Sequence, residues 1–419
     1  RDLGAMKAAA AHAAKGAAAR RLGSDGVGRR GVSVYAWGVG SDGRLGLPPS
    51  EVPKESNTVA SFLATFTEST PPRKQLAPRL IELPFEVRDI SAGYKHTLAV
   101  TSTGELASWG CGSKFCLGSS SEADVEEPAL VLSPSGTPAV SGLRSVAAGG
   151  VFSAALGEKG EVYTWGDGGN IVDGGGMLGH GDLAVRRVPT IVDFFSKYDA
   201  TIKSVSVGAK HMVLLTDDGE VLTCGVGESG RLGHGHATDV LEPEPVDSIE
   251  EDIVQAVAGR EFTLALTASG TVLGWGRNDH GQLGMGSGLN LDAYAMEELP
   301  KVLEGMEGVQ VSSIAAGRGH GAAITPDGKL YVWGMQADTN ATVVELPKQK
   351  RAKQVDCGNA FVAVVAEDGS LYTFGTSKVA LGHGDGRGRR APTLVKGLSG
   401  KKVTRVVAGH DHVFALTED

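Results

Sequence analysis

The feature that most constrains this 419-residue chain is a step from an aromatic residue to glycine that recurs along its length. Trp or Phe precedes glycine at six places, and Cys-Gly fills the one gap in the series. The seven steps are Trp37-Gly38, Trp109-Gly110, Trp165-Gly166, Cys224-Gly225, Trp275-Gly276, Trp333-Gly334 and Phe374-Gly375. All five tryptophans of the chain stand in this position, so the steps mark an internal repeat of seven units.

A second series runs in phase with the first and shows what each unit contains. Seven Gly-x-x-(His/Phe) segments begin at Gly93, Gly149, Gly208, Gly259, Gly317, Gly358 and Gly409. Each opens an alternating apolar run; in six copies a glycine turn follows, and a second run ends in the aromatic-Gly step. Such a pattern is typical of a β-hairpin. A Leu-Gly step and a Pro-led segment follow most hairpins, so each unit offers about four strands, the size of one propeller blade. The sequence therefore predicts an all-β, seven-bladed β-propeller.

The two ends of the repeat region complement each other. The chain ends at residues 415–419, where the turn of the seventh hairpin is due, and residues 31–38 read as the strand that follows such a turn. We therefore expect the N-terminal strand to complete the last blade and remove the exposed edges that an open ring would leave. This reading gives two parts, a propeller over residues 31–419 and an N-terminal arm over residues 1–30.

The arm differs in composition from the rest of the chain. It is rich in alanine, which favours helix, and its acidic residues are Asp2 and Asp25 only. An Arg-rich, acid-poor helix is similar to a mitochondrial transit segment. A helical docking arm is the alternative, and both can hold for one segment. The basic residues that we expect to contact a partner in either case are Arg20, Arg21, Arg29 and Arg30.

These motifs resemble the regulator of chromosome condensation repeat, which reads Gly-x-x-His, then Asp-Gly-x-Val-Tyr-x-Trp-Gly, then Gly-x-Leu-Gly-x-Gly. The segments 208–216, 218–225 and 230–235 follow it closely, except for Cys224. The resemblance covers residues 31–419. It implies a seven-bladed propeller, and functions that range from nucleotide exchange on the GTPase Ran to photoreception, ciliary scaffolds, ubiquitin-ligase substrate arms and mitochondrial assemblies. The fold does not choose between them. All tryptophans occupy the repeat position, which argues against the photoreceptor branch.

Several function classes find no support in the residues. The net charge is −9, so the chain lacks the basic footprint of a nucleic-acid binder, and we expect nucleic acid only through a larger complex. Four scattered cysteines make neither a disulfide framework nor a zinc site, and no apolar run is long enough to span a membrane. The segments 38–43 and 225–230 match Gly-x-Gly-x-x-Gly, but no helix is expected after them. We find no catalytic, cofactor or metal site and expect a protein that is not an enzyme.

The histidines recur at fixed positions of the repeat. Four follow the Gly-x-x step, namely His96, His211, His320 and His412, and three follow the Leu-Gly step, namely His180, His234 and His383. Recurrence at one position of each unit favours a structural hydrogen-bonding role over catalysis or metal binding.

Departures from the repeat are the places where we expect recognition, because loops on a rigid scaffold usually carry it. Three departures stand out: residues 48–78, 119–140 and 167–176. The partner-binding candidates in them are Arg73, Lys74, Asp167 and Asp173. The first hypothesis is a scaffold or accessory subunit of a multi-subunit assembly, mitochondrial in view of the arm, with nuclear or cytoplasmic and ciliary locations as alternatives. The second is a guanine-nucleotide exchange factor for a small GTPase. Chromatin binding is a third, which the acidic balance disfavours.

Overall fold

The computed structural model of the chain describes residues 32–48, 50–53, 73–196, 198, 201–285, 295–334 and 338–418. Residues 32–419 form one compact unit. The predicted helical arm, with Arg20, Arg21, Arg29 and Arg30, lies outside the described residues, and so do residues 54–72 of the first predicted departure.

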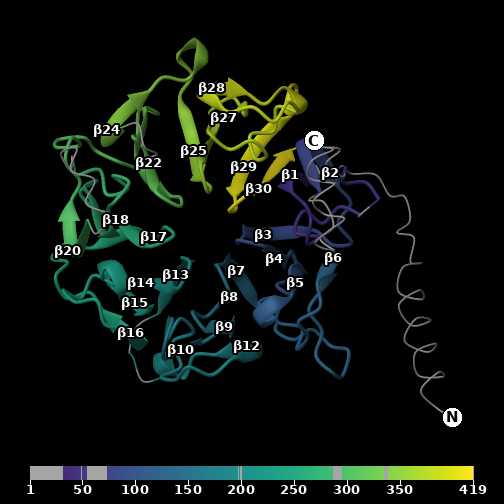
Figure 1. Cartoon of the computed structure of the whole chain (residues 1–419), viewed down its shortest axis with the longest axis vertical. Coiled ribbons are helices and arrows are strands. Elements are labelled where there is room, and N and C mark those ends of the chain that lie inside the picture. Colours follow the sequence, from purple (N-terminus) through teal and green to yellow (C-terminus); the bar gives the residue numbers. More distant parts are fainter. Residues whose placement is uncertain are drawn as a thin grey trace, which may run out of the picture. The chain divides into compact units, whose positions relative to one another are not determined.

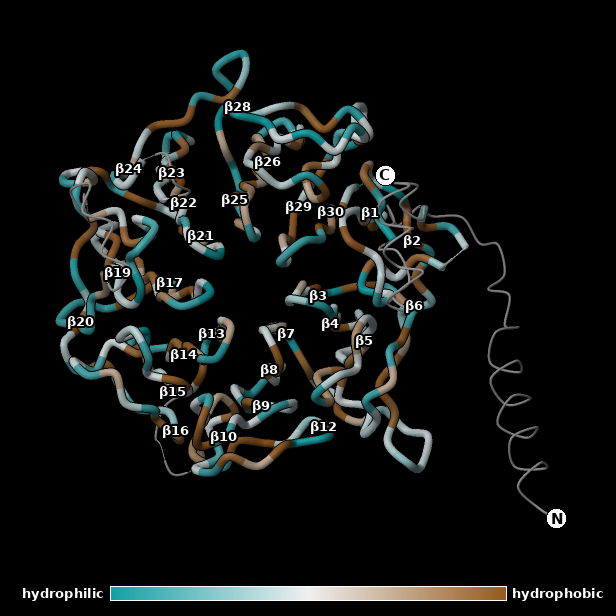
Figure 2. Tube along the Cα trace, in the orientation of Figure 1, coloured by the Kyte–Doolittle hydropathy of each residue, from teal (hydrophilic) through white to brown (hydrophobic). Residues whose placement is uncertain are grey.

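Seven four-stranded antiparallel sheets stand around a common axis and form the ring in Figure 1. The predicted seven-bladed β-propeller is thereby confirmed. In each blade the strands follow one another outward from the axis, so the first strand of every blade faces the centre and the fourth lies at the rim. Hydrophobic segments, brown in Figure 2, recur in the strands around the ring, because each sheet buries its faces against its two neighbours.

The innermost strands are β3 (Val87–Ala92), β7 (Leu143–Ala148), β13 (Ile202–Val207), β17 (Ile253–Ala258), β21 (Ser313–Ala316), β25 (Ala352–Cys357) and β29 (Lys402–Ala408). The second strands are β4 (His96–Thr101), β8 (Phe152–Gly157), β14 (His211–Thr216), β18 (Phe262–Thr267), β22 (His320–Ile324), β26 (Phe361–Ala366) and β30 (His412–Glu418). The third strands are β5 (Leu106–Gly110), β9 (Val162–Gly166), β15 (Val221–Gly225), β19 (Val272–Arg277), β23 (Leu330–Gly334), β27 (Leu371–Gly375) and β1 (Val32–Val39). The outer strands are β6 (Val125–Leu130), β12 (Arg186–Ile191), β16 (Val240–Pro245), β20 (Met296–Val302), β24 (Asp338–Val344), β28 (Arg389–Leu394) and β2 (Lys74–Ile81).

A separate two-stranded hairpin joins β10 (Gly169–Asn170) to β11 (Gly174–Gly175), inside the connection between β9 and β12. The helical elements among the described residues are short 3₁₀ turns: η1 (Ser113–Phe115), η2 (Asp193–Ser196), η3 (Glu228–Gly230), η4 (Pro347–Gln349) and η5 (Lys396–Leu398).

The seventh blade contains both ends of the propeller, with strand order β2-β1-β30-β29. β1 pairs antiparallel with β30 in unbroken register from Val32 opposite Glu418 to Gly38 opposite His412. The predicted closure by the N-terminal strand is therefore confirmed. An ion pair joins this blade to the next one, because Arg405 Nη1 lies 2.5 Å from Oδ1 of Asp89.

The tryptophans of the repeat explain why it is so regular. All five are fully buried, and in four of them the indole Nε1 donates to a backbone carbonyl of the preceding blade. These bonds run from Trp37 to Ala380 (2.8 Å), Trp109 to Arg44 (3.1 Å), Trp165 to Cys116 (2.8 Å) and Trp333 to Gln282 (2.8 Å). Each accepting carbonyl directly precedes a Leu-Gly step, so the two series of the sequence meet at the interface between blades.

The recurring histidines hold neighbouring blades together. The four that follow the Gly-x-x step are at most 1% exposed. Their Nε2 atoms donate to the next blade, from His96 to Ser153 Oγ (2.9 Å), His211 to Thr263 Oγ1 (3.1 Å), His320 to the Phe361 carbonyl (3.1 Å) and His412 to Thr97 Oγ1 (3.1 Å). Burial lowers the pKa of His96 and His320 to about 4, so both are neutral at pH 7. The predicted hydrogen-bonding role is confirmed for these four histidines.

Candidate functional site

One end of the ring carries the connections that vary most between blades. In the third blade, His211 pairs with Gly225, and Gly225 pairs with Val240. The connection between the first two strands and the connection between the last two strands therefore emerge at the same end of the sheet. We call this end the insertion face. It includes the β9–β12 connection with its extra hairpin, whereas the tight glycine turns lie at the opposite end.

A ring of backbone hydrogen bonds ties the insertion face together around a central channel with a volume of about 460 Å³. The second residue of a Gly-x-x-(His/Phe) segment takes part in every bond of the ring. The seven bonds are Tyr94 N to Gly149 O, Gly150 N to Gly208 O, Ala209 N to Arg260 O, Arg260 N to Gly317 O, Arg318 N to Gly358 O, Asn359 N to His410 O and His410 N to Gly93 O, all between 3.0 and 3.3 Å. The backbone at the second residue of each segment is therefore held in place by the ring, which fixes where its side chain begins.

The β10–β11 hairpin projects from the insertion face and exposes an apolar tip. Ile171 is 93% exposed and Val172 is 86% exposed, more than any other large hydrophobic side chain among the described residues. The tip turn is ordered by Asn170, whose Oδ1 accepts from the backbone N–H of Val172 (2.8 Å) and of Asp173 (2.9 Å). Two large aliphatic side chains held in water by an ordered turn are typical of a contact site.

The third blade holds the base of the hairpin. The ammonium group of Lys210 donates to the carbonyl of Asp173 (2.9 Å), and Asp239 Oδ2 accepts from the N–H of Gly175 (2.8 Å). Gly174 has a φ of +83°, and a Cβ there would lie 2.9 Å from the side chain of Val226, so only glycine fits without strain. The hairpin is therefore fixed to the third blade.

The predicted site residues divide into three groups. Asp167 and Asp173 both lie at the hairpin, where they shape it: Asp167 Oδ2 pairs with Lys114 Nζ at 3.1 Å, and Asp173 Oδ2 accepts from Asn170 at 3.0 Å. Arg73 and Lys74 lie where the chain enters the outer strand β2, away from that hairpin in the sequence and on the closing blade. The four arginines of the arm lie outside the described residues. The predicted departure 119–140 includes the outer strand β6, so its middle is part of the blade frame.

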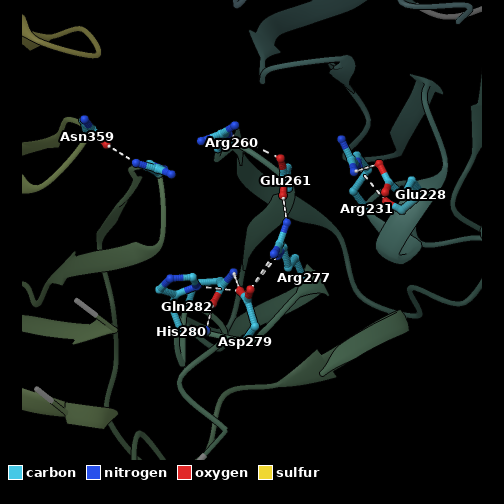
Figure 3. Close-up of polar contacts among 10 residues, drawn as sticks. Glu228, Arg231, Arg260, Glu261, Arg277, Asp279, His280, Gln282 and Asn359 are labelled. Carbon is cyan, nitrogen blue, oxygen red and sulfur yellow. Dashed lines mark hydrogen bonds and ion pairs between the residues drawn. The ribbon is translucent and has the colours of Figure 1, made fainter. Parts of the chain in front are cut away.

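Sequence reasoning missed a charged network on the fourth, fifth and sixth blades of the insertion face, shown in Figure 3. Arg277, at the end of β19, donates to Glu261 (2.5 Å) and to Asp279 (2.8 Å). Arg260 Nε lies 3.3 Å from the second oxygen of Glu261, and Arg318 donates to Asn359 (3.3 Å). These residues line a cleft of about 320 Å³. A signal was present, because Arg occupies the second position of the Gly-x-x-(His/Phe) segment in two copies only, at residues 260 and 318.

The carboxylates of this network are ionised at neutral pH. Burial opposes the charge on Asp279, but hydrogen bonds from Arg277, His280 and Gln282 outweigh it and lower the pKa of Asp279 to about 2. Burial likewise opposes ionisation of Glu261, and its hydrogen bond from Arg277 together with the charges of Arg231 and Arg260 keeps its pKa below the usual value. The described residues contain no group of three or more His, Cys, Asp or Glu side chains placed to hold a metal ion.

Comparison with known proteins identifies the family. The model of the RCC1-like domain matches residues 29–342, and that of the regulator of chromosome condensation (RCC1) repeat matches residues 368–416. The chain belongs to the RCC1-like domain family. Within the part of this RCC1-like propeller that the structure describes, no helix is long and apolar enough to cross a membrane.

Two relatives align with different shares of this chain. The Ultraviolet-B receptor UVR8 of Arabidopsis thaliana is 34% identical over 288 residues, which cover 65% of this chain and 62% of the receptor. The RCC1 domain-containing protein RUG3, mitochondrial, of Arabidopsis thaliana is 29% identical over 372 residues, which cover 83% of this chain and 78% of RUG3. This chain therefore spans less than two thirds of the receptor and more than three quarters of RUG3.

Two solved structures share the fold. The crystal structure of human WBSCR16 matches with a TM-score of 0.77 and 23% identity, over 93% of this chain and all of that one. The structure of Prp20p from Saccharomyces cerevisiae, a protein described by its binding to Gsp1p and histones, matches with a TM-score of 0.74 and 23% identity, over 93% of this chain and 92% of Prp20p. At this level of identity the likeness establishes the fold alone.

Proposed function

We propose that this RCC1-like propeller is a protein-binding scaffold, an accessory subunit of a larger mitochondrial assembly, and that it engages its partner across the insertion face. The observation that carries the proposal is the apolar tip of the β10–β11 hairpin. Ile171 and Val172 are the most exposed large hydrophobic side chains of the described residues, on an element that the neighbouring third blade holds in place.

The energetics favour a contact anchored by this tip. Burying an exposed Val or Ile side chain in a partner contributes about 1.5–3 kcal/mol, so the two together contribute roughly 3–6 kcal/mol. A fixed hairpin loses little conformational freedom on binding, and most of this gain is therefore kept. The hydrogen-bonded ring around the channel adds a surface that does not have to rearrange. A rigid frame with one projecting apolar element is suited to binding rather than to chemical catalysis.

Affinity capture with a hairpin variant tests the proposal. The double variant Ile171→Ser and Val172→Ser removes the apolar tip and should unfold nothing, because both side chains are exposed. Val343→Ser is the matched control, since Val343 is an exposed aliphatic residue (48%) on the outer strand β24. We expect partners captured by the wild-type chain from a mitochondrial extract to be lost with the double variant and kept with the control. An unchanged set of partners with the double variant would contradict the proposal.

The mitochondrial location rests on two supports. The arm at residues 1–30 has the Arg-rich, acid-poor composition of a transit segment, and RUG3, which aligns with most of this chain, carries a mitochondrial designation. Proximity labelling in cells measures compartment and neighbours together. Labelled proteins drawn mainly from the nucleus or the cilium would overturn this part of the proposal, and the binding face would remain to be judged by the hairpin variant.

The same hairpin favours a second candidate, guanine-nucleotide exchange on a small GTPase. A rigid apolar wedge that enters a GTPase beside its nucleotide competes with the nucleotide-bound conformation, and such catalysis needs no cofactor. Release of fluorescent GDP from Ran and from organelle GTPases distinguishes the candidates. Accelerated GDP release that disappears with the hairpin double variant would establish nucleotide exchange. If none of these GTPases released GDP faster, the exchange candidate would be wrong and the scaffold would be the one remaining candidate.

A further inference from the structure

The cleft of about 320 Å³ at the insertion-face ends of the fourth, fifth and sixth blades has the chemistry of an anion site. We call it the arginine pocket and define it by Arg260, Arg277, Arg318, Glu261 and Asp279. We propose that the arginine pocket receives a single carboxylate, offered by an acidic side chain of the protein that covers the insertion face. This inference rests on the proposed function, because it specifies the chemistry of the partner at the same face.

The three guanidinium groups differ in how many of their N–H donors already have a hydrogen-bond partner. The guanidinium group of Arg277 is paired with both Glu261 and Asp279, as Figure 3 shows, so it holds these two carboxylates in place. Arg318 is exposed, and among the described residues its side chain has one hydrogen-bond partner, the amide oxygen of Asn359 at 3.3 Å. Arg260 is ion-paired with Glu261, but its buried Nε makes no hydrogen bond within the described structure. Arg260 and Arg318 therefore keep most of their five N–H donors for a ligand.

The charge of the pocket selects the class of anion. Three guanidinium groups face two carboxylates that stay ionised at neutral pH, which leaves a surplus of one positive charge. A monoanionic carboxylate neutralises that surplus. A dianionic phosphate exceeds it and faces Glu261 and Asp279 at close range. Guanidinium groups bind carboxylates through paired, charge-assisted hydrogen bonds, so the donors of Arg260 and Arg318 match this ligand.

The arginine pocket and the hairpin belong to one continuous surface. Lys210, which holds the hairpin, directly follows Ala209, and the N–H of Ala209 donates to the carbonyl of Arg260 at 3.0 Å. The N–H of Arg260 in turn donates to Gly317, the residue before Arg318. A partner that buries Ile171 and Val172 therefore reaches the arginine pocket by extending across the third blade on the same face. The apolar tip contributes affinity, and the pocket adds selection for an acidic residue at a fixed position.

Peptide binding to the full chain tests the inference. The probe is a fluorescein-labelled peptide of alternating glutamate and serine, compared with a counterpart that has glutamine in place of glutamate. The variants are Arg318→Ala, Arg318→Lys and Arg260→Ala, and the control is Lys353→Ala, an exposed residue near the opposite end of its blade. Fluorescence anisotropy gives the affinity, and a thermal melt verifies that each variant folds.

We expect the glutamate peptide to bind and the glutamine peptide to bind at least about tenfold more weakly. Arg318→Ala and Arg260→Ala should each lower the affinity for the glutamate peptide about tenfold. Arg318→Lys should lower this affinity by an intermediate amount, and Lys353→Ala should leave it unchanged. Equal binding of the two peptides, or unchanged binding by both alanine variants, would overturn the inference. Inorganic phosphate that competes at lower concentration than acetate would overturn the assignment of a carboxylate.

The hairpin double variant separates this inference from the proposed function. It should bind the glutamate peptide as the wild-type chain does, because the peptide needs only the arginine pocket. If the peptide binds at the arginine pocket while partner capture does not depend on the hairpin, the inference about the pocket is supported and the proposed anchoring by the hairpin is wrong. If partner capture depends on the hairpin while the glutamate peptide does not bind, the proposed anchoring by the hairpin is supported and the inference about the arginine pocket is wrong.

Discussion

Replacing His320 with phenylalanine should make the propeller less sensitive to acid. The repeat itself supplies the substitution, since Phe152, Phe262 and Phe361 occupy the same position in other blades. The change also leaves no buried acceptor without a donor, because the Phe361 carbonyl that accepts from His320 accepts from the N–H of Gly358 as well, at 2.9 Å. The variant therefore removes the titrating group with little other disturbance.

The magnitude follows from the difference between the folded and unfolded pKa values. Burial lowers the pKa of His320 from 6.5 to about 4, so the unfolded chain binds more protons between these values and stability falls as the pH falls. Each unit of pKa difference is worth about 1.4 kcal/mol, so His320 costs the fold about 2 kcal/mol between pH 7.5 and pH 5. His96, with its pKa also lowered to about 4 by burial, and His211 and His412 act in the same direction.

Denaturant unfolding at pH 7.5 and pH 5, followed by the fluorescence of the five buried tryptophans, measures the effect. The wild-type chain should lose stability between the two pH values, and His320→Phe should lose about 2 kcal/mol less. If the variant and the wild-type chain lost the same free energy of unfolding, then His320 would not be neutral and buried in the fold, and the reasoning would be refuted.

Two further predictions concern the closure of the ring and its glycine turns. Deleting β1, which buries Val34 and Trp37, should cost about 5 kcal/mol or more, whereas deleting residues 1–25 should change stability little; equal losses in thermal melts would argue against the closure. Gly38→Ala places a Cβ 2.3 Å from the Asp411 carbonyl and should cost about 3 kcal/mol or more, while Gly136→Ala, also at positive φ but with nothing within 4 Å, should cost about 1 kcal/mol. Similar losses of unfolding free energy for the two alanine variants would show that the close contact at Gly38 does not matter.

The repeat made the frame predictable because the same contacts recur at each boundary between blades. Trp109 and Trp165 donate to equivalent carbonyls of the preceding blade, so a residue pattern along the chain encodes an arrangement in space. The closure was predictable for a related reason, since residues 31–38 carry the pattern of the third strand of a repeat and precede the first full unit.

The arginine pocket was not predictable in this way. Arg260 and Arg277 come from two connections of the fourth blade and Arg318 from the fifth, and they line one cleft because the fold brings these connections together on the insertion face. The hairpin was located by its departure from the repeat, but its exposed tip was not foreseen. Sequence reasoning assigned contacts to the acidic residues, and the structure shows Asp167 and Asp173 shaping the hairpin while Ile171 and Val172 face solvent.

Site-specific photo-crosslinking tests the central claim most directly. A benzoylphenylalanine replaces Val172 at the hairpin tip in one variant and Ser135, an exposed residue in the connection after β6 at the opposite end of the ring, in another. After irradiation of cells that express each variant, the chain and its adducts are isolated and identified by mass spectrometry. We predict a defined protein adduct from position 172 and none from position 135. An adduct from position 135 alone, or the same adducts from both positions, would contradict the assignment of the insertion face as the binding surface.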